Sequence, residues 1–154
     1  MKITTISQKG LELIKRFEGL RLKPYLCAAN VPTIGYGNTF YEDGKKVKLT
    51  DPVITEERAT ELLLHSIKSF EKWVDSYCRD DINQNQFDAL VSFAFNLGPN
   101  NLKNSTLLKK VNSNPQDVEI RKEFMKWTKA AGRVLPGLVK RRQDERALYL
   151  SGVA

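Results

Sequence analysis

The fold of this chain is decided by residues 19–49, which read GLRLKPYLCAANVPTIGYGNTFYEDGKKVKL. Prolines and glycines interrupt this stretch every few residues, and Asp43-Gly44 is typical of a hairpin turn. Apolar and aromatic side chains lie between these breaks, namely Tyr25, Val31, Ile34, Tyr36 and Phe40. Short apolar runs separated by tight turns predict a small antiparallel sheet.

Helical patterns lie on both sides of this stretch. Ser7 can cap a short first helix that Gly19 ends. From Thr55 to Cys78 apolar residues recur at helical spacing for about six turns, with Thr55 as the N-cap and acidic residues in the first turn. So long a helix in so small a protein is expected to connect two lobes.

Shorter helices are expected in the remaining sequence. Asn83 and Gln86 resemble a capping box at the start of a helix that ends at Gly98-Pro99. Asn114-Pro115 is expected to begin a helix that runs to Trp127, and Pro136 to begin the last one, which runs to Leu150.

Together these patterns predict an α+β fold in one domain, residues 1–154. We expect a β-rich lobe with the first helix (7–54), a connecting helix (55–78) and a helical lobe (79–154). A cleft between two such lobes would suit a polymer substrate.

Composition narrows the classes of function. The 154 residues are enough for one stable core, and no apolar run reaches the 18 or more residues of a membrane span. Residues 1–7 lack the apolar centre of a secretory signal, so we expect synthesis in a cytoplasm without export by such a signal. The formal charge of +7 favours polyanionic partners, among them nucleic acid, acidic lipid headgroups and bacterial wall polymers.

The cysteines and the single histidine give no sign of a disulfide framework or a metal site. Cys27 and Cys78 are too few for such a framework, and neither they nor His65 has the spacing of zinc ligands. The sequence also lacks a phosphate-cradling glycine loop and a Gly-x-Ser-x-Gly elbow. We therefore expect no metal and no cofactor.

Several spaced motifs resemble one enzyme family. Residues 18–24 read EGLRLKP and residues 33–38 read TIGYGN, and the resemblance continues in 86–98 and 132–142. Together they resemble the phage-type lysozymes, glycoside hydrolase family 24, over roughly residues 8 to 150. The family signature is a Glu, eight residues, an Asp or sometimes a Cys, five residues and a Thr, here Glu18, Cys27 and Thr33.

The resemblance implies a two-lobed lysozyme-like fold and an endolysin that cuts the β-1,4 bond between N-acetylmuramic acid and N-acetylglucosamine. Glu18 would be the general acid, and the Thr33 hydroxyl would help hold the attacking water with inversion at the anomeric carbon. The matching positions for substrate binding are Phe95, Asn96 and Ser105.

The resemblance also implies partners and location. The partner would be the peptidoglycan glycan strand, with no nucleic acid and no membrane insertion, and the protein would be a monomer. It would accumulate in the host cytoplasm and reach the cell wall in the periplasm through pores made by a separate membrane protein.

Each candidate residue also has a structural interpretation. Glu18 would be a solvated helix-end residue paired with Arg21 or Lys23, Thr33 an ordinary strand residue and Phe95 a core aromatic. Cys27 would be a small buried hydrophobe. Cys27 also has chemical alternatives. It could be a thiolate, with its ionisation assisted by Lys23 or a C-terminal arginine, or a covalent nucleophile. In a further alternative, Thr33 and the backbone provide more of the catalysis than Cys27 does.

Other features favour structural roles. We expect His65 to be partly buried on the connecting helix and Cys78 to be a packing residue, with a redox pairing to Cys27 left open. The run Lys140-Arg141-Arg142 is expected to be a solvated face; its functional alternatives are attraction to an anionic wall and an ion pair that positions Glu18.

Two other classes of protein share some of these sequence features. One is a catalytically silent wall-binding domain on the same fold, which the intact Glu18 and Thr33 disfavour. The other is a nucleic-acid-binding protein, which rests on the charge alone because no binding motif accompanies it.

Overall fold

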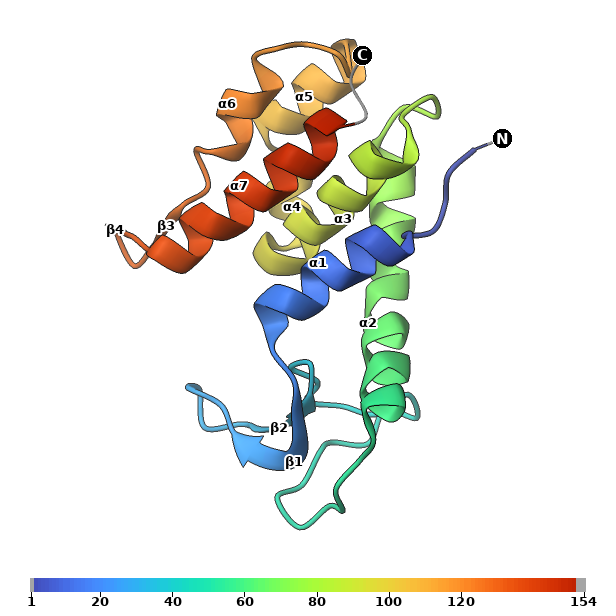
Figure 1. Cartoon of the computed structure of the whole chain (residues 1–154), viewed down its shortest axis with the longest axis vertical. Helices are drawn as coiled ribbons and strands as arrows, with labels where there is room; N and C mark the ends of the chain where they lie inside the picture. Colours follow the sequence, from blue (N-terminus) through green and yellow to red (C-terminus); the bar gives the residue numbers. More distant parts are fainter. Residues whose placement is uncertain (1, 152–154) are drawn as a thin grey trace. The chain divides into compact units, whose positions relative to one another are not determined.

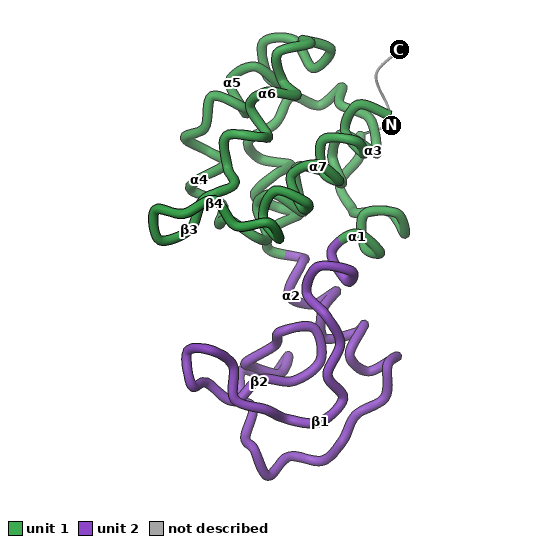
Figure 2. The backbone as a smooth tube through the Cα atoms, turned by 60° about the vertical axis from the view of Figure 1, so that its left-hand side comes forward, with its two compact units in different colours: residues 1–13, 69–154 green, residues 14–68 purple. Residues whose placement is uncertain are grey.

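The computed structural model describes residues 2–151 as an α+β fold with two small antiparallel sheets (Figure 1). These residues divide into two compact units, which are described separately: unit 1 comprises residues 2–13 and 69–151, and unit 2 comprises residues 14–68 (Figure 2). The helices α1 (Gln8–Glu18) and α2 (Glu56–Tyr77) each contribute residues to both units. The boundaries between the units therefore fall inside these helices, at 13/14 and 68/69. The division into a β-rich lobe, a connecting helix and a helical lobe stays a prediction.

Unit 2 contains the predicted sheet. Strands β1 (Arg21–Leu26) and β2 (Pro32–Gly35) pair antiparallel, with Tyr25 opposite Thr33. A small core of Ile34, Val47 and Leu62 lies between the sheet and α2. The first turn of α2 is capped as expected, since Arg58 N donates to the Thr55 hydroxyl over 3.1 Å.

Unit 1 is mainly helical. Its elements are α3 (Gln84–Leu97), α4 (Pro99–Lys103), α5 (Thr106–Ser113), α6 (Ile120–Phe124), β3 (Lys129–Ala130), β4 (Arg133–Val134) and α7 (Pro136–Ser151). Helices α3 and α7 pack side by side (Figure 1). The ring of Phe93 on α3 packs edge-to-face against two other aromatic rings. Its centroid is 5.6 Å from that of Trp127 and 6.0 Å from that of Phe124.

The predicted capping box is confirmed at the start of α3. The Asn83 side chain accepts from Gln86 N over 2.9 Å, and the Gln86 side chain accepts from Asn83 N over 3.0 Å. The helix ends at Gly98, at a φ of 95°, as predicted.

The helix predicted from Asn114-Pro115 to Trp127 is wrong in extent. Only Ile120–Phe124 are helical, because local side chains hold the preceding residues in turns. Asn114 Oδ1 accepts from Gln116 N over 3.0 Å and Asp117 Oδ1 accepts from Glu119 N over 2.9 Å. Such Asx turns compete with helix formation.

The sequence contains no apolar run long enough to predict a membrane-spanning helix. Among the described residues, none of the helices combines the length and the apolar character needed to cross a bilayer.

Candidate active site

Glu18 is the last residue of α1 and is half-buried. Gly19 ends the helix with φ at 74°, and its N–H donates to Lys15 O over 3.0 Å. Gly37, also at positive φ, lies beside the carboxylate: a Cβ built on Gly37 would be 3.8 Å from Glu18 Oε1. The carboxylate therefore lies beside the backbone of the turn that carries Gly37.

The turn that carries Gly37 is fastened to the rest of unit 2. Ile34 and Asn38 exchange two backbone hydrogen bonds of 2.9 Å across it. The buried Asn38 side chain donates to Ser66 Oγ over 2.8 Å and to Leu62 O over 3.3 Å, both on α2. A buried amide with two acceptors holds this turn in place.

Cys27 lies in the loop that joins the strands of the sheet. Its N–H donates to Val31 O over 3.1 Å, and its carbonyl accepts from Asn30 N over 2.8 Å. Asn30 has a φ of 61°, in the left-handed region that asparagine tolerates better than most residues. This conformation curls the loop around the half-buried thiol.

Hydrogen bonds stabilise the ionised form of that thiol. The backbone at Val31, then the backbone at Ala29 and then the Thr33 hydroxyl lower the pKa of Cys27 below its usual value of 9.0. From the sequence, Lys23 or a C-terminal arginine was the group suggested to assist ionisation of Cys27; the groups that lower its pKa here are neutral donors. A concave group of donors of this kind is a common device for holding an anion.

Thr33 completes the group from strand β2. Its side chain is 3% exposed, and Oγ1 donates to Val31 O over 2.8 Å. A hydroxyl has one proton, so it must rotate away from Val31 O to donate to an ionised Cys27. The Thr33 hydroxyl therefore lies close enough to Cys27 to lower the pKa of its thiol, and Glu18 belongs to the same unit.

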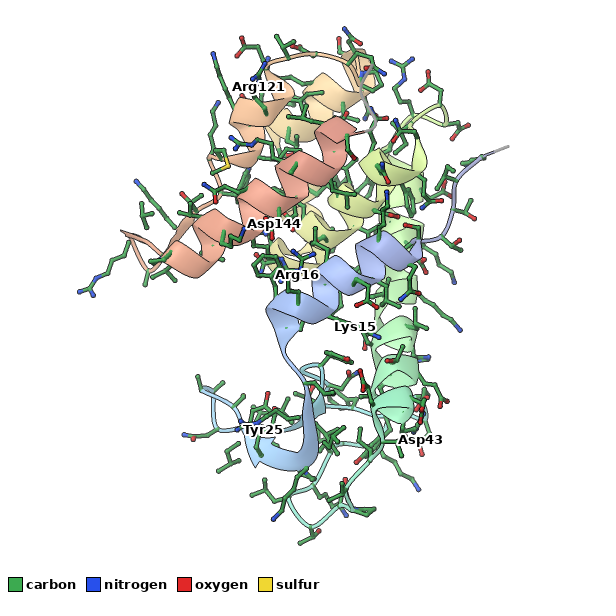
Figure 3. The ribbon with its side chains drawn as sticks, viewed as in Figure 1. Lys15, Arg16, Tyr25, Asp43, Arg121 and Asp144 are labelled. Atoms are coloured by element: carbon green, nitrogen blue, oxygen red, sulfur yellow. The ribbon has the colours of Figure 1, made fainter. Side chains whose placement is uncertain are left out.

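Two aromatic side chains lie close to cations in unit 2. The Arg21 guanidinium is 4.6 Å from the Tyr25 ring centroid, and Lys15 Nζ is 5.6 Å from that of Tyr36. Figure 3 labels Lys15 on α1 and Tyr25 on β1.

Cys78 differs from Cys27 in burial and in the direction in which its pKa is shifted. It is buried in unit 1, and burial, with the nearby Asp75, raises its pKa to about 12. Both cysteines are free thiols. The expectation that Cys78 packs in a core is confirmed, whereas His65 is exposed on α2 and not partly buried as expected, because its position on the helix points away from the apolar face.

The three predicted substrate-binding residues all lie in unit 1. Phe95 is half-buried, with its ring centroid 5.1 Å from that of Phe70. Asn96 Oδ1 accepts from Arg142 Nη2 over 2.8 Å. Ser105 is 4% exposed and caps α5: its Oγ accepts from Leu108 N over 3.0 Å and donates to Leu102 O over 2.7 Å.

The basic run on α7 is not the solvated face that was expected. Lys140 is exposed and pairs with Asp144 over 3.1 Å, but Arg141 and Arg142 are buried. Both arginines pair with the buried Glu145, at 3.3 and 2.7 Å, and Glu145 also accepts from Ser92 Oγ over 2.6 Å. The Glu145 carboxylate, three and four residues further along the same helix, balances one of the two charges. The arginines also donate to neutral acceptors, Arg141 to Ser92 O over 3.3 Å and Arg142 to Asn96 Oδ1 over 2.8 Å.

Comparison with known proteins adds to this geometry. Residues 15–145 match the family model described as phage lysozyme. The endolysin of Bacillus phage B103 is 46% identical over 149 residues, which are 96% of this chain and 54% of that protein. The endolysin of Acyrthosiphon pisum secondary endosymbiont phage 1 is 45% identical over 150 residues, 95% of this chain and 98% of that protein.

A solved structure agrees with these relatives. The endolysin from Escherichia coli O157:H7 phage FAHEc1 superposes with a TM-score of 0.88 at 36% identity, over 99% of this chain and 98% of that one. This chain belongs to the phage lysozyme family. It spans about half the length of the B103 endolysin and nearly the whole length of the aphid-symbiont phage endolysin.

Family membership confirms the resemblance and the lysozyme-like α+β fold predicted from the sequence. The roles of Glu18, Cys27, Thr33, Phe95, Asn96 and Ser105 in this member of the family remain predictions. The sequence reasoning did not single out Gly37 and Asn38, although both lie in the TIGYGN motif. Gly35 and Gly37 flank Tyr36, and such a pair of glycines indicates a backbone turn that approaches another group closely.

Proposed function

We propose that this chain is a lysozyme that hydrolyses the β-1,4 bond between N-acetylmuramic acid and N-acetylglucosamine in bacterial peptidoglycan. The observation that carries the proposal is the chemistry of unit 2: a half-buried carboxylate, Glu18, beside a glycine turn, together with a thiol, Cys27, whose pKa is lowered by nearby backbone groups and by the Thr33 hydroxyl. Glycoside hydrolysis needs an acid for the leaving oxygen and a second group for the water or the anomeric centre.

In this mechanism Glu18 donates a proton to the glycosidic oxygen as the bond to the anomeric carbon breaks. Thr33 accepts a hydrogen bond from the attacking water and orients it, and the thiolate of Cys27 stabilises the positive charge that develops on the sugar ring. The proton that the water loses on attack passes to the solvent. The lowered pKa of Cys27 supports the thiolate form. Attack by water from the face opposite the leaving group inverts the anomeric configuration.

Substrate binding is assigned to Phe95, Asn96 and Ser105 of unit 1. Arg142 occupies the carbonyl oxygen of the Asn96 side chain, which leaves its two amide hydrogens for a sugar oxygen. The Phe95 ring offers an apolar surface to a sugar face. The Ser105 hydroxyl already caps α5 and donates to Leu102 O, so its contribution to substrate binding is the weakest of the three.

For the biological setting, we propose a monomer without cofactor that acts on the wall and causes lysis after release from the host cytoplasm. The endolysins among its relatives support this setting.

Replacing Glu18 with Gln tests the proposal. The change keeps the size of the side chain but removes the proton to be transferred, so lysis of chloroform-treated Gram-negative cells should fall by about 10²–10⁴-fold. The matched control is Glu12→Gln, an exposed glutamate on the same helix, which should clear cells at nearly the wild-type rate. Near wild-type clearing by Glu18→Gln would refute the assigned acid, and inactivity of the wild-type protein on walls and chitooligosaccharides would refute the enzyme.

A further inference from the structure

The positive charge of this chain is concentrated in one part of the sequence. Residues 103–140, hereafter the basic segment, contain nine basic and three acidic residues. The other 116 residues contain 16 basic and 15 acidic residues. The basic segment therefore accounts for six of the seven net positive charges. A field this asymmetric is strongest over one region and directs encounters with polyanions to it.

Most of this charge is available to a partner. Eight of the nine basic side chains are exposed, and Lys110 is half-buried. Within the described residues, intramolecular ion pairs engage only Lys122, Lys126 and Lys140 among the nine. Arg121 on α6 is labelled in Figure 3, as is Asp144 on α7, which pairs with Lys140.

The basic residues cover several elements and do not surround one pocket. They lie on α4, α5, α6, the β3–β4 hairpin and the start of α7, except Lys126, which lies in the turn after α6; α6 packs against both α5 and α7. Seven of the nine are lysines, whose compact charges on flexible stems suit many loose contacts better than one bidentate site. A long polymer with repeated negative charges fits this distribution better than a short peptide.

Nucleic acid fits the basic segment less well. Single strands are bound largely by stacking bases on aromatic rings. The aromatic residues of the segment are Phe124, which is buried, and Trp127, which is half-buried with its ring against Phe93. Base-specific contacts to duplex DNA come mainly from arginine, and the segment contains two.

We propose that the basic segment is a docking surface for a phosphodiester-linked anionic polymer of the bacterial cell wall. The inference rests on the proposed function and concerns Gram-positive walls, in which such a polymer is attached to the peptidoglycan that the enzyme would cleave. Phosphodiesters stay ionised throughout the physiological pH range, so their attraction to lysine is constant. Glu18, Cys27 and Thr33 all lie outside the segment, in unit 2, so docking and hydrolysis are separable by mutation.

The test compares two variants of equal net charge. The segment variant carries Lys109→Gln, Arg121→Gln, Lys122→Gln and Lys129→Gln, and the control variant carries Lys9→Gln, Lys46→Gln, Lys68→Gln and Lys72→Gln. All eight side chains are exposed, and each variant has a formal charge of +3. Binding is measured at about 0.05 M salt by sedimentation with purified Gram-positive walls, before and after hydrofluoric acid removes their phosphodiester polymers. Thermal unfolding confirms that both variants are folded.

We expect the segment variant to bind native walls at least tenfold more weakly than wild type, and the control variant within about threefold of wild type. Acid-stripped walls should bind all three proteins weakly and alike, and all three should hydrolyse a short neutral chitooligosaccharide at the same rate. Equal losses in the two variants would overturn the proposal, as would undiminished binding to stripped walls. Tighter binding to duplex DNA or to anionic vesicles than to native walls would assign the surface to another partner. Hydrolysis is measured apart from binding. If the proposed function fails, none of the proteins hydrolyses the chitooligosaccharide; if only the docking proposal fails, hydrolysis remains and the two variants do not differ in wall binding.

Discussion

Cys27 combines solvent access with a group of donors that favours its ionised form. Backbone groups at Val31 and Ala29 and the Thr33 hydroxyl lower its pKa, whereas burial raises the pKa of Cys78 to about 12. Thiolates, not thiols, react with alkylating agents. Cys27 should therefore react readily with alkylating agents, and Cys78 should react slowly.

This contrast predicts the order of alkylation. With iodoacetamide, Cys27 should react in the folded protein with a pH midpoint below 9.0, because its folded-state pKa is lowered. Cys78 should stay unmodified from pH 6 to 9 until denaturant exposes it. Peptide mass spectrometry over a pH series measures both rates. A midpoint at or above 9.0 for Cys27, or labelling of Cys78 first, would contradict the described environments.

Substitution of the same residue separates its chemical roles. Cys27→Asp should keep or raise lytic activity, because aspartate is ionised at neutral pH without help from its surroundings. Cys27→Ala should lose much more, and the control Cys78→Ala should stay near wild type in catalysis because Cys78 occupies no motif position. Full activity in Cys27→Ala would leave Cys27 as a packing residue only. Retention at the anomeric carbon, detected by NMR of the first product, would favour a covalent thiolate route over the inverting one.

For single residues, the sequence gives candidates for the site but not their surroundings. Glu18, Cys27 and Thr33 are candidates because they match the family signature, and their roles stay predictions; Cys78 could be recognised as a packing residue. The donors around Cys27 could not be predicted, because they depend on Asn30 adopting a φ of 61°. Burial of Arg141 and Arg142 was missed for a similar reason: the sequence places Glu145 within reach but does not say that all three are enclosed.

Among the elements, the loop after β2 is tied to α2 by an ion pair within unit 2. The Arg58 guanidinium donates to both oxygens of Glu42, over 2.6 and 2.7 Å. This pairing lowers the pKa of Glu42 to about 2. Both side chains are about one-third exposed, so solvent screening reduces the benefit to roughly 0.5–1 kcal/mol.

The pair gives stability a defined pH dependence. Because the folded-state pKa of Glu42 is lowered, its stabilisation is fully present above the unfolded-state value near 4.5 and is lost as the pH falls toward 2. Glu42→Gln should therefore cost up to about 1 kcal/mol of unfolding free energy at pH 6 and nearly nothing near pH 2. Urea unfolding at several pH values measures this. The control Glu61→Gln removes a more exposed carboxylate 3.6 Å from the same arginine and should change little; a cost independent of pH in Glu42→Gln would refute the linkage.

Helix and strand positions were predictable where local chemistry decides them. The caps at Thr55 and Asn83 and the stop at Gly19 are short-range features, and all three are present. The length of α6 was not predictable from periodicity, because Asn114 and Asp117 hold turns that interrupt the apolar pattern. Where a polar side chain can bond its own backbone, a periodic pattern alone overstates a helix.

Across the whole molecule, a charge of +7 should make attack on walls sensitive to salt. Screening acts over about 8–10 Å at 0.1–0.15 M ionic strength, which weakens long-range attraction to an anionic wall. Raising the salt from about 0.02 to 0.2 M should therefore slow lysis of walls several-fold. Hydrolysis of a short neutral chitooligosaccharide should change far less, and equal sensitivity of the two rates would eliminate electrostatic steering as the cause.

The discontinuous build of unit 1 has a consequence for the order in which the protein can be completed during synthesis. Ser7 donates from its N–H and its hydroxyl to Asp88, and Ile6 N donates to Glu71, so residues near the start bond to partners 65 and 81 positions later. At about 5–20 residues per second, the ribosome needs roughly 4–16 s to add the 81 residues from Gln8 to Asp88. All of unit 2, residues 14–68, is translated before Asp88, so the start of α1 still lacks this partner when unit 2 is complete. The segment with the candidate acid can therefore begin to fold before the residues that complete unit 1 have been made.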